Sequence, residues 1–139
     1  MRLWLVAIAL ALPASEGRAA TLRCVFTEPF YTLTFDTETG TVTELTNDIE
    51  DPDTGKPIPQ IVAEGAKLRI PDPNDGFSMR LVKGNDTILE LHLNGQGSDG
   101  MSEFYFPFEA KRGGNDGGCD TVKHPAYDPY DVLEELGLQ

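Results

Sequence analysis

Apolar and polar residues alternate along most of the chain with a period of two, which is typical of strands buried on one face. Residues 31–35 place aromatic and leucine side chains between threonines, and residues 89–93 place leucines between polar residues. These runs recur about every ten residues with turn signals between them, which favours an all-β fold, a small antiparallel barrel or sandwich. The predicted strands cover residues 22–26, 31–35, 41–45, 77–81, 89–93 and 101–106, and residues 58–63 and 67–70 form two short strands or one bent strand with a bulge at Gly65.

The aromatic segment 98–110 and the glycine-rich stretch after it stand out in the second half of the chain. The run 101–106 is apolar and aromatic enough to predict a strand buried on at least one face. Pro107 has no amide hydrogen to donate, so it marks an edge or the end of that strand. Residues 113–118 are expected to turn the chain and lead to Cys119.

The last residues carry the signals of one short helix over 129–136. Asp128 suits the N-cap, Pro129 suits the first helical position, and Gly137 follows as a C-cap. A helix of under three turns is marginal alone, so its apolar residues must pack on something to hold it. These residues are Tyr130, Leu133 and Leu136.

The first nineteen residues read as a signal peptide. Arg2 precedes an uncharged apolar run, residues 3–12, that is too short to span a bilayer as a helix, and Pro13 and small residues follow it. The mature chain then begins near Ala20 and is exported to the periplasm, with no stable membrane insertion after cleavage. A buried N-terminal helix is the alternative. The predicted organisation is a signal peptide over 1–19, a β domain over 20–122 and a tail with a short helix over 123–139.

Acidic residues outnumber basic ones. The whole chain has 11 Lys and Arg against 23 Asp and Glu, and removal of residues 1–19 leaves 9 against 22, a net charge of −13. Nucleic acid is excluded as a partner because phosphate binding needs clustered cations. The charge favours solubility and a cationic envelope protein or a divalent cation as partner. A solvated acidic surface with no partner is the alternative.

Two cysteines in an exported protein predict one disulfide, Cys24 to Cys119. In the chain-entropy description, closing a loop of this length stabilises the fold by about 4–5 kcal/mol. If the first and last core strands are neighbours, the bond staples them together at the seam of a barrel. Two such distant thiols do not predict a metal site, because zinc needs more ligands.

Three stretches of the chain resemble a known group of proteins. Cys-Val-Phe-Thr-Glu-Pro-Phe at 24–30, Ser-Asp-Gly-Met-Ser at 98–102, and Tyr-Phe-Pro-Phe at 105–108 with Gly-Cys at 118–119 are similar to an uncharacterised family of small exported bacterial proteins, sometimes labelled predicted membrane proteins. The resemblance implies a compartment and a fold, and no reaction. Family relatives tend to have a cysteine just before Ser-Asp-Gly-Met-Ser and a doubled cysteine near the end. This chain has Gly97 and a single Cys119, as though a second disulfide were missing as a unit.

Four residues of these motifs are candidates for binding: Glu28, Phe30, Asp99 and Ser102. The turn 27–30 is a possible recognition loop with Glu28 as its anchor; the alternative is a bulge at a barrel rim with Phe30 in the core. Asp99 and Ser102, together with Glu103, are candidates to line a cleft; the alternative is that Asp99 bonds to its own turn backbone.

The remaining motifs weigh against most chemistry. The acidic loop 48–53 supplies oxygens for calcium but lacks the alternating acids and distal Glu of a known calcium loop, so an ordinary solvated loop is the alternative. His92 and His124 have no ligand companions at metal spacing, and no phosphate-binding or Gly-x-Ser-x-Gly motif is present. The sequence therefore predicts neither a metal site nor a cofactor.

Three functions stay open. The favoured one is a periplasmic binding or interaction module of small β-barrel type. A specific form of it is a lysozyme-inhibitor-like protein, because a small, acidic, disulfide-closed protein suits a cationic hydrolase. The third is an envelope enzyme that uses Glu28 and Asp99 as acid and base, which needs two acids with different pKa values brought together.

Overall fold

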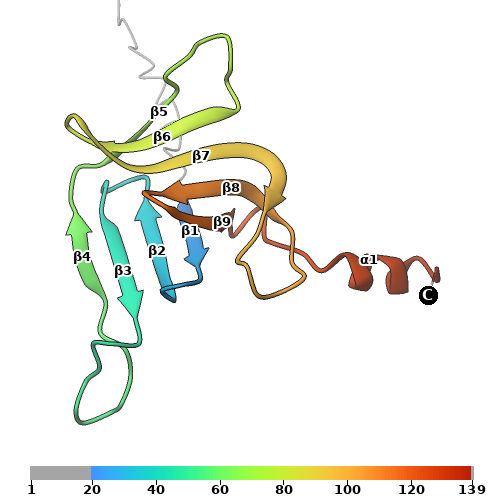
Figure 1. The fold of residues 1–139 in the computed structure, drawn as a ribbon, viewed down its shortest axis with the longest axis horizontal. Helices are drawn as coiled ribbons and strands as arrows, with labels where there is room; N and C mark the ends of the chain where they lie inside the picture. The colour runs from blue at the N-terminus through green and yellow to red at the C-terminus, as the bar shows by residue number, and fades with distance from the viewer. Residues whose placement is uncertain (1–19, 139) are drawn as a thin grey trace, which may run out of the picture.

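The computed structural model describes residues 20–138, so the predicted signal peptide over 1–19 lies outside the described residues. The described chain is mostly antiparallel strand with one short helix at its end (Figure 1). Its elements are β1 (Thr21–Phe26), β2 (Tyr31–Asp36), β3 (Val42–Thr46), β4 (Gln60–Ala63), β5 (Lys67–Arg69), β6 (Ser78–Lys83), β7 (Asp86–Gly97), β8 (Phe106–Arg112), β9 (Asn115–Thr121) and α1 (Pro129–Glu135). The prediction of an all-β fold with a short C-terminal helix is confirmed.

All nine strands form a single sheet in the order β4-β3-β2-β1-β9-β8-β7-β6-β5. Two meanders, β1 to β4 and β5 to β9, are therefore joined by the pairing of the first strand with the last. The sheet curls into a half-barrel, and in Figure 1 the strands of one meander run nearly across those of the other. Its two edges, β4 and β5, follow one another in the chain, so the predicted bend near Gly65 separates two strands.

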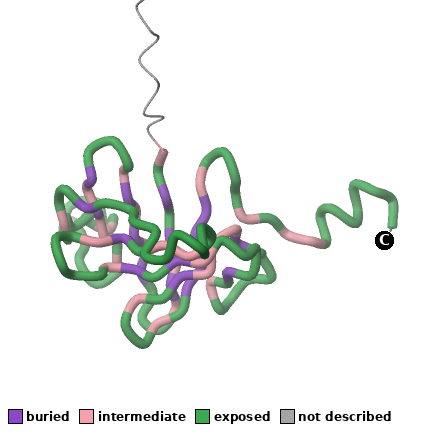
Figure 2. Tube along the Cα trace, turned by 90° about the horizontal axis from the view of Figure 1, so that it is seen from above, coloured by how far each residue is buried: buried purple, intermediate pink, exposed green. Residues whose placement is uncertain are grey.

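The core lies on the concave face of this sheet, because every second side chain of the central strands points there. In β1 and β2 the buried positions alternate strictly with more exposed ones. Figure 2 shows buried positions recurring along the strands, while the turns are exposed. The core consists of Leu22, Cys24, Phe26, Tyr31, Leu33, Phe35, Val42, Ala66, Leu81, Leu89, Leu91, Ala110 and Cys119.

The seam between β1 and β9 carries the disulfide. Cys24 and Cys119 are directly opposed in the antiparallel register, with their Cα atoms 4.0 Å apart, and the two sulfur atoms are bonded. The predicted pairing of the first and last strands is confirmed. Arg23 precedes Cys24, and its register partner Asp120 follows Cys119. The Arg23 guanidinium donates two hydrogen bonds of 3.2 Å to the buried carboxylate of Asp120.

Glycines of the predicted turn 113–118 lie inside β9, which corrects that prediction. The turn itself is Gly113-Gly114, and the strand begins at Asn115. Gly117 and Gly118 pair with β1 and are covered by aromatic rings: a Cβ atom there would lie 2.6 Å from the ring of Phe26 or Phe106, respectively. Glycine in a strand interior here serves a close approach of side chains, not a turn.

The strand predicted over 101–106 is also wrong in its bounds. Residues 101–105 are exposed and form a loop and an isolated bridge, and β8 begins at Phe106. Pro107 lies within β8, not at its end. It is accommodated because the pairing of β7 with β8 is interrupted there, between the pairs Leu93–Phe108 and Gly97–Phe106.

The C-terminal tail crosses back to the body before it forms the helix. Tyr105 and Tyr127 exchange two backbone hydrogen bonds, of 2.9 and 3.1 Å. Asp128 then caps α1 by accepting from the Tyr130 amide, and Gly137 ends it with a positive φ of 71°, as predicted. The expectation that its apolar residues pack on something is not met within residues 20–138, where α1 has no buried residue.

Candidate binding surface at the β1–β2 turn

The turn between β1 and β2 presents an aromatic side chain to solvent. Phe30 is 56% exposed, so the alternative that placed it in the core is wrong. The register of β1 and β2 runs without a shift up to Phe26 and Tyr31, so the turn is no bulge. Glu28 has a φ of 63°, which is rare for a side chain that is not glycine and is a form of backbone strain that recurs at functional sites.

The loop 98–102 is held by its own hydrogen bonds. The Asp99 carboxylate accepts from the amides of Met101 and Ser102, at 2.9 and 2.8 Å, and from the Ser102 hydroxyl, at 2.7 Å. Partial burial acts to raise the pKa of Asp99, but these hydrogen bonds outweigh it and lower the pKa below its usual value. The alternative of turn chemistry is therefore confirmed for Asp99, whereas Ser102 and Glu103 also line an open hollow of about 370 Å³.

The two motifs meet although about seventy residues separate them in sequence. Gly100 lies against Thr27: a Cβ atom at Gly100 would approach the Thr27 hydroxyl to 2.5 Å. Only glycine fits there, because the residue also has a φ of 78°. The loop 98–102 thus supports the turn that presents Glu28 and Phe30.

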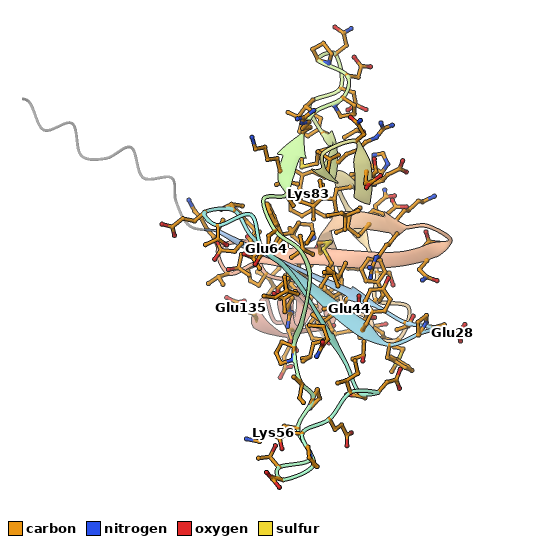
Figure 3. All side chains as sticks on the ribbon, turned by 90° about the vertical axis from the view of Figure 1, so that its left-hand side faces the viewer. Glu28, Glu44, Lys56, Glu64, Lys83 and Glu135 are labelled. Carbon is orange, nitrogen blue, oxygen red and sulfur yellow. A yellow bond between two sulfur atoms is a disulfide. The ribbon has the colours of Figure 1, made fainter. Side chains whose placement is uncertain are left out.

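Next to Phe30 lies an open cavity of about 380 Å³ that contains an ion pair. Arg112 Nη1 lies 3.1 Å from Glu44 Oε2, and its guanidinium lies over the ring of Tyr31, 5.2 Å from the centroid. Figure 3 shows Glu28 at the tip of its turn and Glu44, which lies on β3, farther from that tip. The cavity is lined by Pro29, Phe30, Tyr31, Glu44, Thr46, Asp48, Arg112, Gly113 and Asn115.

The charge of Arg112 is fixed by its neighbours. Burial acts to lower the pKa of Arg112, and the contacts with Glu44 and Tyr31 outweigh it and raise the pKa. The Tyr31 hydroxyl is buried and, among residues 20–138, lacks a hydrogen-bond partner of good geometry, the nearby guanidinium included. Sequence reasoning missed Glu44 and Arg112 because 68 positions separate them and no motif surrounds either one.

Acid and base chemistry by Glu28 and Asp99 finds little support in this geometry. Both carboxylate oxygens of Asp99 accept hydrogen bonds from its own loop. Its lowered pKa keeps the carboxylate ionised at neutral pH, whereas a general acid needs a raised pKa. The arrangement is suited to holding a surface in place rather than to moving protons.

A second polar cluster, on β6 and β7, was not predicted. The Ser78 hydroxyl lies 2.7 Å from Asp75 Oδ2 and 2.8 Å from His92 Nδ1. In a catalytic triad the histidine lies between the other two groups, so that the carboxylate stabilises its charged form. Here the hydroxyl lies between the carboxylate and the imidazole, so the cluster lacks the order of a triad and instead braces the β5–β6 connection against β7.

Comparison with protein families, with curated proteins and with solved structures finds no match to this chain. The resemblance of its motifs to a family of small exported proteins therefore stays a prediction. No helix in the described part of the chain is long and apolar enough to cross a membrane. Across residues 20–138, including the acidic loop 48–53, no three acidic, histidine or cysteine side chains gather as a metal site would need.

Proposed function

We propose that this protein is an exported, periplasmic binding module and that its contact surface is the β1–β2 turn with the adjoining loop 98–104. The exposed ring of Phe30 is the observation that carries the proposal. An aromatic side chain held on a constrained turn loses little conformational freedom on binding, which is why such residues often dominate interface energies.

The partner class follows from charge. Glu28 and Glu103 are exposed on these two segments, and the mature chain carries a net charge of −13. A field of this sign accelerates the approach of a cationic protein, and an apolar anchor amid carboxylates then holds it. A cationic hydrolase of the envelope, such as lysozyme, has the opposite charge and acts in the proposed compartment, so it is the partner that we propose.

Lysozyme binding and inhibition test the proposal directly. The mature, disulfide-bonded protein should bind lysozyme and lower its activity at low ionic strength, with a weaker effect at about 1 M salt. Phe30→Ala should weaken binding about tenfold or more, because truncation of an anchoring aromatic removes roughly 2 kcal/mol. Val122→Ala, at a residue that is 92% exposed and outside this surface, is the matched control.

A pull-down from periplasmic extract separates the general proposal from its lysozyme form. If lysozyme is untouched but a cationic protein is retained by the native chain and lost with Phe30→Ala, the partner is another cationic protein. If neither lysozyme nor any extract protein distinguishes the native chain from Phe30→Ala, the turn is not a binding surface and the proposal is wrong.

A further inference from the structure

The cavity of about 380 Å³ beside Phe30 opens on the inner face of the half-barrel, and we call it the Phe30 cavity. Tyr31 lies opposite Thr46 in the register of β2 and β3. Leu33 lies opposite Glu44 in the same register. Paired residues point to the same face of a sheet, and both β2 residues belong to the core, so the side chains of Thr46 and Glu44 lie on the inner face.

Arg112 reaches the Phe30 cavity from β8, which three other strands separate from β3 in the sheet. Phe108 lies opposite the core residue Cys119, and Arg112 is four positions farther along the same unbroken ladder, so it shares the inner face. Its Nη1 atom donates to Glu44 Oε2 at 3.1 Å. Strands so far apart in a sheet can touch only because the sheet curls (Figure 1).

The lining of the Phe30 cavity has more negative than positive charge. Glu44 and Arg112 compensate each other, and the second oxygen of Glu44, Oε1, has no partner among residues 20–138. In that part of the chain the Asp48 carboxylate makes no ion pair and accepts no hydrogen bond. Two carboxylates against one guanidinium leave a net charge of −1, so the lining favours a cation over an anion.

The Tyr31 hydroxyl indicates that a polar group enters from outside the chain. Tyr31 lines the Phe30 cavity and is 6% exposed, and its hydroxyl oxygen is buried without a hydrogen-bond partner among residues 20–138. The large majority of buried side-chain polar atoms in native proteins have such a partner. Because the charge of the lining favours a cation, the group that would complete this site is an N–H donor.

We propose that the Phe30 cavity takes a lysine side chain of the partner, with its ammonium group beside Asp48 and Glu44 and its methylene stem against Phe30. An ammonium group has three N–H donors and no acceptor, and the polar groups without partners in the cavity are acceptors: carboxylate oxygens and the Tyr31 hydroxyl. The stem of a lysine is apolar and covers apolar surface, which the half-exposed ring of Phe30 offers. The inference rests on the proposed function in one respect, that the partner is a cationic protein.

Nuclear magnetic resonance titration of the mature, disulfide-bonded protein tests the Phe30 cavity without a partner protein. The probe is lysine with an acetyl and an N-methylamide cap, whose only charge is the ammonium group. The amide signals of Tyr31, Thr46 and Asn115 should shift with a dissociation constant of about 1 mM, because an exposed ion pair and one short stem bind weakly. The same probe with its ammonium group acetylated should bind at least about tenfold more weakly, because it lacks the charge.

Three variants locate the ammonium group. Asp48→Asn leaves the Glu44–Arg112 pair in place and should raise the dissociation constant of the capped lysine about threefold to fivefold. Asp53→Asn makes the same change on the same exposed loop but outside the lining, and should leave the constant unchanged. Thr46→Lys places an ammonium group of the chain itself in the cavity and should remove binding of the probe. The amide spectrum of each variant also shows that it is folded.

Four outcomes would overturn the inference. They are the absence of a saturable shift at the cavity amides, equal binding of the acetylated probe, an Asp48→Asn effect no larger than that of Asp53→Asn, and retention of binding by Thr46→Lys. Titration with capped glutamate should cause no shift at these amides. Binding of capped glutamate in place of capped lysine would assign the cavity to a carboxylate and would overturn the inference as well.

Lysozyme separates this inference from the proposed function. If Phe30→Ala weakens lysozyme binding while Thr46→Lys leaves it unchanged and capped lysine does not bind, the contact surface is supported and the lysine site is wrong. If capped lysine binds as expected while neither lysozyme nor any extract protein distinguishes the native chain from Phe30→Ala, the lysine site is supported and the proposed function is wrong. Loss of lysozyme binding with both Phe30→Ala and Thr46→Lys, together with binding of capped lysine, is the result that we expect.

Discussion

The middle of this sheet and its two edges are held in opposite ways. At the β1–β9 seam, strands from the two ends of the domain share a continuous ladder, a disulfide and the Arg23–Asp120 pair. At the opening between β4 and β5, strands that are consecutive in the chain are both edges, and their connection is fixed by the Ala66 amide bonding to the Gly40 carbonyl at 2.9 Å. The strongest links thus join β1 and β9, the two strands whose pairing closes the longest loop and loses the most chain entropy. At the opening, apolar and basic side chains stay exposed.

Loss of the disulfide should be the largest single effect on stability. The bond closes a loop of 95 residues, and its removal should lower the free energy of unfolding by about 4 kcal/mol. For a domain of this size the melting temperature should fall by more than 10 °C, at about 3–6 °C per kcal/mol. Thermal unfolding of the reduced protein, of Cys24→Ala and of Cys119→Ala should give similar values.

The double variant is the control for that comparison. Once one partner is gone the bond is gone, so Cys24→Ala with Cys119→Ala should be no less stable than either single variant. Two reactive thiols in the unfolded, unreduced protein would show that the bond is absent, and the seam would then be held by its ladder and the Arg23–Asp120 pair.

Loss of an ion pair should also lower stability more at the seam than beside the opening, but by less than loss of the disulfide does. Asp120 is 5% exposed and accepts from Arg23 and from the Ala126 amide, at 3.0 Å, so Asp120→Ala leaves donors unpaired and should lower stability by about 1–3 kcal/mol. Glu90, beside the opening, lies 3.9 Å from Arg80 with both side chains about half exposed, and Glu90→Ala should change stability by under about 0.5 kcal/mol. Equal effects in urea unfolding would contradict the distinction between seam and opening.

Strand existence, the short helix and the disulfide could all be predicted, because each leaves a local mark: period-two alternation, cap residues, or the only two cysteines. The errors fall where distant packing overrides a local signal. Gly117 and Gly118 look like a turn, yet they are strand residues because rings from β1 and β8 occupy the space of their side chains. Pro107 looks like a strand end, yet a break in the neighbouring ladder accommodates it.

The position before the Ser-Asp-Gly-Met-Ser motif shows the same lesson. That residue is Gly97, the last residue of β7. A Cβ atom at Gly97 would overlap the Phe108 carbonyl, so this backbone excludes any side chain at that position. The requirement for glycine therefore depends on how β7 meets β8, which sequence alone does not reveal.

The candidate site was predictable only in its motifs. The turn 27–30 and the loop 98–102 carry recognisable residues, but their contact through Thr27 and Gly100 has no local signal, because the strands before them, β1 and β7, are not neighbours in the sheet. Glu44 and Arg112 carry no local signal, since their pairing depends on the register of strands far apart in sequence. The exposure of Phe30 likewise depends on the turn geometry and not on its hydrophobicity.

The smallest predicted effect concerns a turn motif that occurs both near the seam and near the opening. Asp99 and Ser102, beside the β1–β2 turn, and Asp75 and Ser78, in the β5–β6 connection, each pair a carboxylate with a hydroxyl three residues on, at 2.7 Å. The pKa of Asp99 is lowered because its hydrogen bonds outweigh burial, and that of Asp75 is lowered first by the Ser78 hydroxyl. Since the native state then binds fewer protons than the unfolded state, each carboxylate stabilises the fold above its unfolded pKa of 3.8, and the effect is lost as pH falls through the lower native value.

Asp99→Asn should therefore lower the melting temperature by a few degrees at neutral pH, and the difference from the native chain should shrink as the pH falls below 3.8. Asp75→Asn should change it in the same sense but by less. Asp75 is exposed in a connection that packs on little, whereas the Asp99 loop braces Thr27 and the end of β1. Melting curves of both variants across this pH range measure the contrast. An Asp75→Asn effect as large as that of Asp99→Asn would mean that the β5–β6 connection is held as firmly as the rim of the seam, and that the opening is not the weaker region.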